Sequence, residues 1–228
     1  MSDVKKKPEK KHIRVVLSNL ISRYRIPLLI FFGIVIVSMI GVAVYSAYNQ
    51  NSVEKSSIAA EELQSIYDEW SSAAEDEKAD LKTELLQKAE LAANRYSRLF
   101  AAQRAYLITG RVFYAEEEWE KSIEQFKLLA EKFPKSYLAP VSLMSAAAAY
   151  EQLEDYESSI ELYNRIGVAY AESFPSTAYA LISMGRLYEK LNDRIAAIET
   201  YNQVIDNFSG SSWTNIAQNR IIYLETLN

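Results

Sequence analysis

The residue types that most often perform chemistry are nearly absent from this chain. His12 is the only histidine in 228 residues, and there is no cysteine. The sequence therefore lacks a thiolate nucleophile, a disulfide, a lipidated cysteine and any cluster of histidine and cysteine that would hold a metal ion. It also lacks a glycine-rich phosphate-binding loop. We predict a protein that is not an enzyme, with no catalytic residue, no cofactor and no metal site.

Carboxylates and tyrosines are abundant but form no recognisable site. The run Glu116-Glu117-Glu118 has no apolar setting that would shift a carboxyl pKa, and it is interpreted as a solvated turn. The 16 tyrosines are interpreted mainly as packing residues between helices. His12 lies in a basic tail, where a surface position is the simplest interpretation. The absence of cysteine leaves the redox compartment open, because a helical domain of this size folds without disulfides.

Charge and composition narrow the class of protein. Residues 1–25 hold eight basic and two acidic residues, whereas the rest of the chain holds 17 basic and 28 acidic residues. An acidic body argues against nucleic acid as a partner. The chain has only six glycines and five prolines and is rich in Ala, Glu, Leu and Tyr, which favours an all-α fold.

A segment without charge follows the basic tail. Residues 26–48 are almost wholly apolar, and 23 helical residues span about 34 Å, enough for a hydrocarbon core of about 30 Å. We predict a single transmembrane helix here, in contact with the lipid bilayer. The bias of Lys and Arg places residues 1–25 in the cytoplasm and residues 49–228 across the membrane. In a bacterium these locations are the inner membrane and the periplasm.

Two other interpretations of the apolar segment are disfavoured. A cleaved signal peptide is disfavoured by the length of the apolar run and of the tail before it. A buried helix of a soluble protein is disfavoured because no polar face interrupts the run. Apolar residues from Ile13 to Tyr24 recur at helical spacing, which predicts an amphipathic helix on the inner leaflet. An ordinary basic flank is the alternative.

A pattern of about fifteen residues occurs three times further along. FYAEEEWEKSIEQF (113–126), AYEQLEDYESSIELY (149–163) and LYEKLNDRIAAIETY (187–201) have a period of 37 and then 38 residues. Two small residues lie 12 apart in each copy, and an aromatic residue follows four positions later. Small residues let two helices cross closely, so each copy is predicted to be a helical hairpin with a polar turn at 115–118, 152–155 or 190–193. The columns are Gly110, Ala147 and Gly185; Ser122, Ser159 and Ala197; and Phe126, Tyr163 and Tyr201.

These columns resemble the tetratricopeptide repeat, in which a proline follows the second helix, helix B. Pro134 has this place in the first copy. Pro175 comes four residues late in the second copy, which predicts that helix B is one turn longer there, around residues 167–172. The third copy lacks the proline. The resemblance implies a solenoid of three to four hairpins with a C-terminal capping helix.

The ends of the solenoid are predicted from the same periodicity. Trp213–Leu227 matches helix A of the third copy at an offset of 35, with Arg220 in place of the small residue, as a capping helix would allow. An earlier hairpin is expected upstream, with helices at 53–74 and 81–96 and an acidic turn at 75–80. The predicted divisions are a tail (1–25), a transmembrane helix (26–48), a polar linker (49–57) and the repeat domain (58–228).

The resemblance also implies a binding surface on the concave side, formed by helix A of each repeat. A mixture of apolar, aromatic and arginine side chains there fits an extended or helical segment of another protein. Arginines that are merely solvated are the other interpretation. The family's clamp for C-terminal carboxylates is not matched, because Leu107 occupies its basic position. The implied residues are Arg104, Leu107, Arg111, Tyr114, Val141, Met144, Ala148, Glu151, Tyr179, Ile182, Arg186 and Glu189.

The order of parts resembles the family of the ancillary subunit of the bacterial Sec translocon. That family has a short cytoplasmic tail, one transmembrane helix and a periplasmic tetratricopeptide domain. The resemblance implies a membrane-anchored scaffold that passes translocated substrates to periplasmic chaperones. A scaffold for envelope assembly or cell division, and a solute- or lipid-binding partner of a transporter, stay open. A closed apolar pocket would favour a small ligand, and an open groove a polypeptide.

Overall fold

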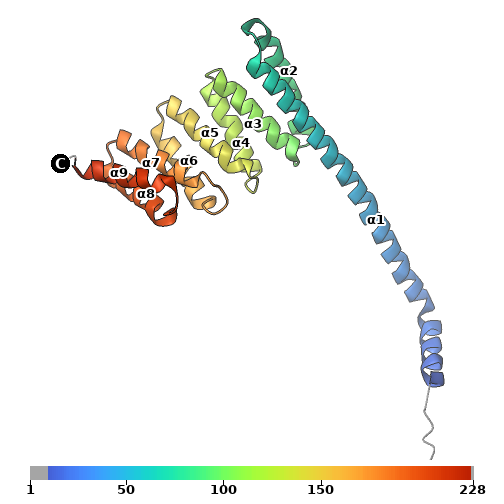
Figure 1. The fold of residues 1–228 in the computed structure, drawn as a ribbon. Helices are drawn as coiled ribbons and strands as arrows, with labels where there is room; N and C mark the ends of the chain where they lie inside the picture. The colour runs from blue at the N-terminus through green and yellow to red at the C-terminus, as the bar shows by residue number, and fades with distance from the viewer. Residues whose placement is uncertain (1–9, 227–228) are drawn as a thin grey trace, which may run out of the picture. The chain divides into compact units, whose positions relative to one another are not determined.

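The computed structural model describes the backbone of residues 10–226 and the side chains of residue 24, residues 26–27 and residues 29–226. Within this range the chain forms nine α-helices and no strand (Figure 1). The predicted all-α fold is confirmed. The chain divides into two compact units, with the boundary between Val53 and Glu54.

The first unit is the N-terminal part of α1, a helix that runs from Lys10 to Ser72 and contains Pro27. All side chains from residue 29 to residue 50 are exposed. By length and composition this helix can cross a membrane, a test that a signal sequence also passes. The helical backbone includes residues 13–24, but the proposed apolar face there lies outside the described side chains, Tyr24 excepted.

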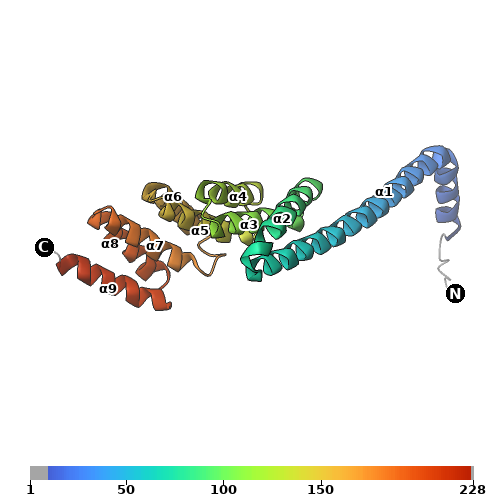
Figure 2. The same cartoon turned by 90° about the horizontal axis from the view of Figure 1, so that it is seen from above.

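The second unit is a row of helical hairpins. In Figure 2, α4 and α6 lie along one side of this unit, and α3, α5 and α7 lie along the other. Four hairpins and a closing helix match the predicted solenoid. The C-terminal part of α1 pairs with α2 (Glu75–Arg95), α3 (Phe100–Ala115) with α4 (Trp119–Lys132), α5 (Leu138–Gln152) with α6 (Tyr156–Ala169), and α7 (Thr177–Lys190) with α8 (Arg194–Asn207), before α9 (Ser212–Thr226).

The turns inside the three C-terminal hairpins share one backbone geometry. Glu117, Glu154 and Asn192 have φ angles of 60°, 58° and 59°, so each turn passes through the left-handed region. Asp155 and Asp193 then cap the following helix, each accepting a hydrogen bond from a backbone N–H three residues on, at 3.1 and 3.0 Å. Such caps satisfy one of the free N–H groups at a helix start. The turns therefore lie where the sequence repeat places them.

Two apolar clusters hold the second unit together. One joins α1, α2 and α3 and includes Leu63, Trp70 and Leu85, whereas the other extends from α3 to α9. Ser56 is only 1% exposed, and its hydroxyl accepts a hydrogen bond from the N–H of Ala101 at the start of α3, at 2.9 Å. The segment 49–57, expected as a polar linker, is thus helical, and its last residues pack with the repeats.

The predicted turn at residues 75–80 is wrong, because this acidic segment forms the beginning of α2. Glu75, Asp76 and Glu77 occupy the first turn of this helix. The partial positive charge at a helix N-terminus favours carboxylates there. The chain instead turns at residues 73–74.

The prediction of a longer helix B in the second copy is wrong. Helix α6 has 14 residues, as α4 and α8 do. It ends where Tyr170 turns into the core, with its hydroxyl donating to the carbonyl of Pro134 at 2.9 Å. The aromatic residues that close the three helices are Phe133, Tyr170 and Phe208, and they keep the 37- and 38-residue spacing. Pro175 lies four residues late because the loop, not the helix, is longer.

The offset of 35 for the C-terminal helix is also wrong. The buried Ala217 and Leu224 of α9 lie 37 residues after the buried Ala180 and Leu187 of α7. The two helices therefore align at the same period as the other repeats. Arg220 does not occupy the small-residue position and instead forms an ion pair with Glu189 on α7.

Candidate functional site

Close crossings between paired helices set the spacing of the repeats. A Cβ atom built on Gly110 would lie 2.6 Å from the ring of Phe126, and one on Gly185 would lie 2.5 Å from the ring of Tyr201. Both distances are too short for a side chain, so the aromatic ring of helix B rests directly on the backbone of helix A. Any larger residue must push the ring or the helix aside.

The serine column closes the same crossings from the other helix. The hydroxyl of Ser122 donates to the carbonyl of Gly110 at 2.8 Å, and that of Ser159 donates to the carbonyl of Ala147 at 2.9 Å. Both serines are fully buried, so these bonds satisfy groups that water cannot reach. Ala197 is buried in the same place in the third hairpin, without a hydroxyl. Pro134 and Pro175 lie exposed in loops.

The side chains expected on the concave surface come from α3, α5 and α7. We use the name helix A face for the eleven that are at least partly exposed. Leu107 is 1% exposed and lies in the core, so it cannot contact a partner. The members of the helix A face are Arg104, Arg111 and Tyr114 on α3, Val141, Met144, Ala148 and Glu151 on α5, and Tyr179, Ile182, Arg186 and Glu189 on α7.

Glu151 links two neighbouring hairpins. Its carboxylate accepts a hydrogen bond from the Tyr163 hydroxyl of its own hairpin at 3.0 Å. It also accepts one from Nη2 of Arg186, in the next hairpin, at 2.6 Å. The Glu151 side chain is 13% exposed and that of Arg186 47%. The arginine that was expected to bind a partner's carboxylate is therefore already paired.

Glu189 repeats this arrangement one hairpin later. It accepts from the Tyr201 hydroxyl at 2.5 Å and from Nε of Arg220 at 3.0 Å, and Nη2 of Arg220 makes a second, shorter bond to the same carboxylate. Arginine and carboxylate meet as two parallel forks, the stronger geometry for such a pair. We call these two sets of residues the tyrosine–glutamate–arginine links.

The links also set the protonation of the two tyrosines. Burial, and next the negative charge of Glu151, raises the pKa of the Tyr163 hydroxyl above its usual 10.0. Burial, with the hydrogen bond to Glu189 as the next cause, raises the pKa of Tyr201 in the same way. Both hydroxyls therefore remain protonated at neutral pH and serve as donors to the carboxylates.

The first of these hairpins, α3 and α4, lacks such a link. Phe126 has no hydroxyl, and Tyr114 stands in the position of Glu151, where its ring packs edge-on against Trp119 at 4.9 Å between centroids. Arg111 is half-buried and makes no hydrogen bond or ion pair with any described residue. This end of the helix A face thus keeps a positive charge without a described counter-ion, on the same helix as Tyr114.

Arg104 lies further along the same helix in a more restricted setting. Its Nη1 donates to the side-chain oxygen of Gln64 at 3.3 Å, and its guanidinium lies 5.2 Å from the ring centre of Phe100. Its Nε is buried without a partner among the described residues. Arg104 is therefore partly committed to α1, and Arg111 is the freer of the two cations.

Apolar side chains separate the charged positions of the face. Val141, Met144 and Ile182 are half-buried. Tyr179 is 41% exposed, and its ring lies 5.2 Å from that of Trp213 on α9. Together they offer an apolar surface on which a polypeptide segment can lie.

Three hollows of the repeat domain open to solvent. One lies between α1 and α2, one is lined by α2, α3 and α4, and one by α7, α8 and α9. Such open hollows favour a polypeptide over an enclosed solute. Among the described side chains, no three His, Asp or Glu residues are grouped to hold a metal ion.

Sequence patterns of known families match two parts of the repeat domain. Residues 104–136 and residues 178–207 each match a family model of the tetratricopeptide repeat. These two segments are tetratricopeptide repeats. A TPR repeat-containing protein of Treponema pallidum (strain Nichols) is 31% identical over 123 residues, which cover 54% of this chain and 51% of that protein. This chain therefore spans about half the length of that relative.

Solved structures share the fold. The tetratricopeptide-like repeats of a Podosopora anserina protein, described as a kinesin light chain, superpose with a TM-score of 0.53 at 13% identity, over 73% of this chain and 87% of that one. A point variant of the same protein gives 0.52 at 13% identity, over 73% and 86%. At this identity the likeness shows the fold alone. The chain thus has the fold of tetratricopeptide repeats and matches their sequence pattern in two segments, residues 104–136 and 178–207. Repeats of this kind are protein–protein interaction modules.

Proposed function

We propose that this protein is a scaffold anchored in the bacterial inner membrane, with its repeat domain in the periplasm and a polypeptide partner on the helix A face. The observation that carries the proposal is the α3 end of that face. Arg111 has no counter-ion there among the described residues, and the same face carries Tyr114 on α3 and the half-buried Val141 and Met144 on α5. A cation without an acceptor beside apolar surface fits a segment that carries both a carboxylate and apolar side chains.

The anchor is supported by the first unit. Its apolar stretch is fully exposed, which the solvent would penalise but a bilayer would favour. The excess of Lys and Arg before this stretch supports an N-terminus in the cytoplasm. A phosphatase reporter fused after Asn228 is expected to be active outside the cytoplasm. Reporter activity only in the cytoplasm would contradict this orientation.

We further propose that the partners are the Sec translocon and periplasmic chaperones, between which the scaffold passes substrates. The support is the order of parts, a basic tail, an apolar helix and then repeats, and the open helix A face, which suits an unfolded polypeptide. A bacterial relative with tetratricopeptide repeats is consistent with this setting.

Brief crosslinking in cells, followed by purification from mild detergent, tests the proposal. Translocon subunits and chaperones are expected with the unaltered chain, and they should be depleted in Arg111→Glu. Lys135→Glu, the same charge change at an exposed loop position, is the control and should keep them. Recovery of only division, outer-membrane assembly or transporter proteins would overturn the translocon assignment. Equal recovery of these partners from both variants would show that they do not bind the helix A face through Arg111.

A further inference from the structure

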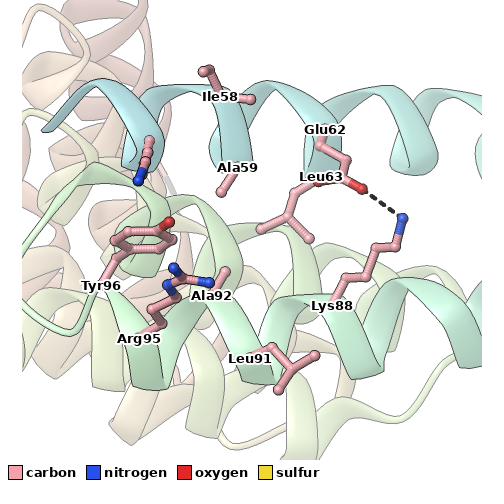
Figure 3. A pocket seen from close by; sticks show the side chains of 10 residues that line it. Ile58, Ala59, Glu62, Leu63, Lys88, Leu91, Ala92, Arg95 and Tyr96 are labelled. Carbon is pink, nitrogen blue, oxygen red and sulfur yellow. Dashed lines mark hydrogen bonds and ion pairs between the residues drawn. The ribbon is translucent and has the colours of Figure 1, made fainter. Parts of the chain in front are cut away.

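The hollow between α1 and α2 lies at the end of the repeat domain that no hairpin covers. Its volume is about 380 Å³, and Figure 3 shows its lining. Side chains from both helices contribute, among them Lys55, Ile58 and Glu62 from α1 and Lys88, Leu91 and Arg95 from α2. The described residues leave it open to solvent.

The rims of this hollow are apolar. Ile58 of α1 is 58% exposed and Leu91 of α2 is 68% exposed, and Figure 3 shows them on opposite sides of the hollow. Inside the solenoid, side chains between neighbouring hairpins are covered by the hairpin next in line. Here no described helix precedes α1 and α2, so these two side chains lie in water, at a free-energy cost that an apolar ligand would relieve.

Two cations inside the hollow lack counter-ions. Lys88 is neutralised by Glu62 at 2.6 Å and by Glu84 at 3.0 Å. Lys55 and Arg95, by contrast, form no ion pair with any described residue. The guanidinium of Arg95 lies 5.5 Å from the ring centre of Tyr96. Lys55 and Arg95 are both exposed, so the hollow combines two solvated cations without a described counter-ion with an apolar rim.

The position of the hollow in the sequence restricts what can reach it. Lys55 follows Tyr48, the last residue of the apolar segment, by only seven residues. Seven residues span at most about 25 Å even when fully extended. Whatever the arrangement of the chain between them, Lys55 remains within that distance of the end of the apolar segment. When that segment crosses a bilayer, phospholipid headgroups are the anions that are always near.

We propose that this hollow binds the headgroup of an anionic phospholipid. Lys55 and Arg95 donate to the phosphate, and Ile58 and Leu91 contact the carbon atoms of the headgroup beside it. Basic residues close to a membrane surface attract anionic lipid in this way. The inference rests on the proposed anchor, and it assigns the first hairpin a second contact with the bilayer, separate from partner binding on the helix A face.

The test uses the full chain in lipid nanodiscs. Because the sequence has no cysteine, a single fluorophore can be placed by Gln87→Cys, an exposed position one turn before Leu91 on α2. Quenching by a lipid with a spin-labelled headgroup is measured while phosphatidylglycerol replaces phosphatidylcholine in steps. We expect quenching to increase with the anionic lipid. A second label at Gln203→Cys on α8 reports the far end of the repeat domain.

The Lys55→Glu/Arg95→Glu double variant should raise the anionic lipid fraction needed for half-maximal quenching at least about fivefold, because each cation near an anionic surface contributes roughly 1 kcal/mol. The Lys127→Glu/Lys135→Glu variant makes the same change of charge elsewhere and should behave like the unaltered chain. Equal quenching in neutral and anionic discs would overturn the inference, as would equal losses in the two variants. Quenching replaced by self-association of the chain at this face would identify a second copy as the occupant and also overturn it.

Failure of the inference can be told from failure of the proposed function. A chain that does not co-elute with the discs has no membrane anchor, and the proposed scaffold is then wrong. A chain that enters the discs but shows no lipid-dependent quenching at residue 87 keeps its anchor and loses only the headgroup site.

Discussion

The hairpin of α3 and α4 and the two hairpins that follow it cross in the same way but carry different chemistry on their helix A faces. In the later hairpins, Tyr163 and Tyr201 donate to Glu151 and Glu189, which in turn bind an arginine of the next helix A. In α3 and α4 the ring is that of Phe126, and no carboxylate is needed. The same steric column accepts either ring.

The hydroxyl of a buried tyrosine changes which charges are available on the helix A face. A buried tyrosine hydroxyl requires an acceptor, and a carboxylate that supplies it requires a cation in turn. The arginine of the next repeat supplies that cation, which removes it from the binding surface. In the hairpin of α3 and α4, Phe126 has no hydroxyl and Tyr114 stands in place of the glutamate, so no link to α5 forms. Arg111, on α3 itself, pairs with no described carboxylate and stays available. The helix A face is therefore neutralised at one end and cationic at the other.

The crossings themselves should give the largest effects. Gly185→Leu and Gly110→Leu are each expected to lower the free energy of unfolding by about 1–3 kcal/mol or more. The added side chain would overlap the aromatic ring that already contacts the backbone of helix A. Gly185→Leu should cost more, since a hydrogen bond to Glu189 holds Tyr201 in place, whereas Phe126 has no such bond. Urea unfolding of the detergent-solubilised chain, followed by circular dichroism, measures both. Unchanged stability in either variant would contradict the close crossing.

Removal of a link carboxylate should come next. Glu189→Ala leaves the buried hydroxyl of Tyr201 without its acceptor and is expected to destabilise the chain by about 1–3 kcal/mol. Glu124→Ala, an exposed glutamate on α4, should change stability by no more than about 0.5 kcal/mol. The same unfolding measurement compares them. Equal losses would show that the link adds no stability.

Exchange of the rings tests the comparison directly. Tyr163→Phe removes one hydrogen bond and should cost about 1 kcal/mol. The reverse change, Phe126→Tyr, should gain nothing, because Tyr114 rather than a carboxylate lies opposite. A clear stabilisation by Phe126→Tyr would mean that an acceptor for the new hydroxyl exists in the hairpin of α3 and α4.

Alkaline pH should weaken the two tyrosine–glutamate–arginine links, whereas neutral pH should leave their contribution to stability unchanged. The pKa values of Tyr163 and Tyr201 are raised above 10.0 by burial and by their glutamates, so the folded state holds these protons more tightly than the unfolded state. Their contribution is complete below pH 10 and is lost as the pH rises above it. The Tyr163→Phe/Tyr201→Phe variant should therefore lose less stability between neutral pH and pH above 10. Tyr137→Phe, which alters an exposed ring, is the control and should follow the unaltered chain.

Several details of the fold could not be predicted from local patterns. The proline rule placed the end of α6 too late, because the helix ends where Tyr170 reaches the core and Pro134. The acidic residues at the start of α2 suggest a turn by composition, but carboxylates also stabilise a helix N-terminus. The offset of α9 was two residues out, because small residues are not required where no helix B packs. In each case a long-range contact, or its absence, decided between two local interpretations.

The class of fold, the hairpin turns and the helix crossings follow from the sequence alone, because a period of 37 and 38 residues and the small-residue columns act through steric contact. The presence of one apolar segment before the repeats follows from it too. Which charges on the helix A face are free depends instead on contacts between hairpins. Arg186 meets Glu151, and Arg220 meets Glu189, across separations of 35 and 31 residues. Such pairs depend on how neighbouring hairpins stack, and no local pattern records that stacking.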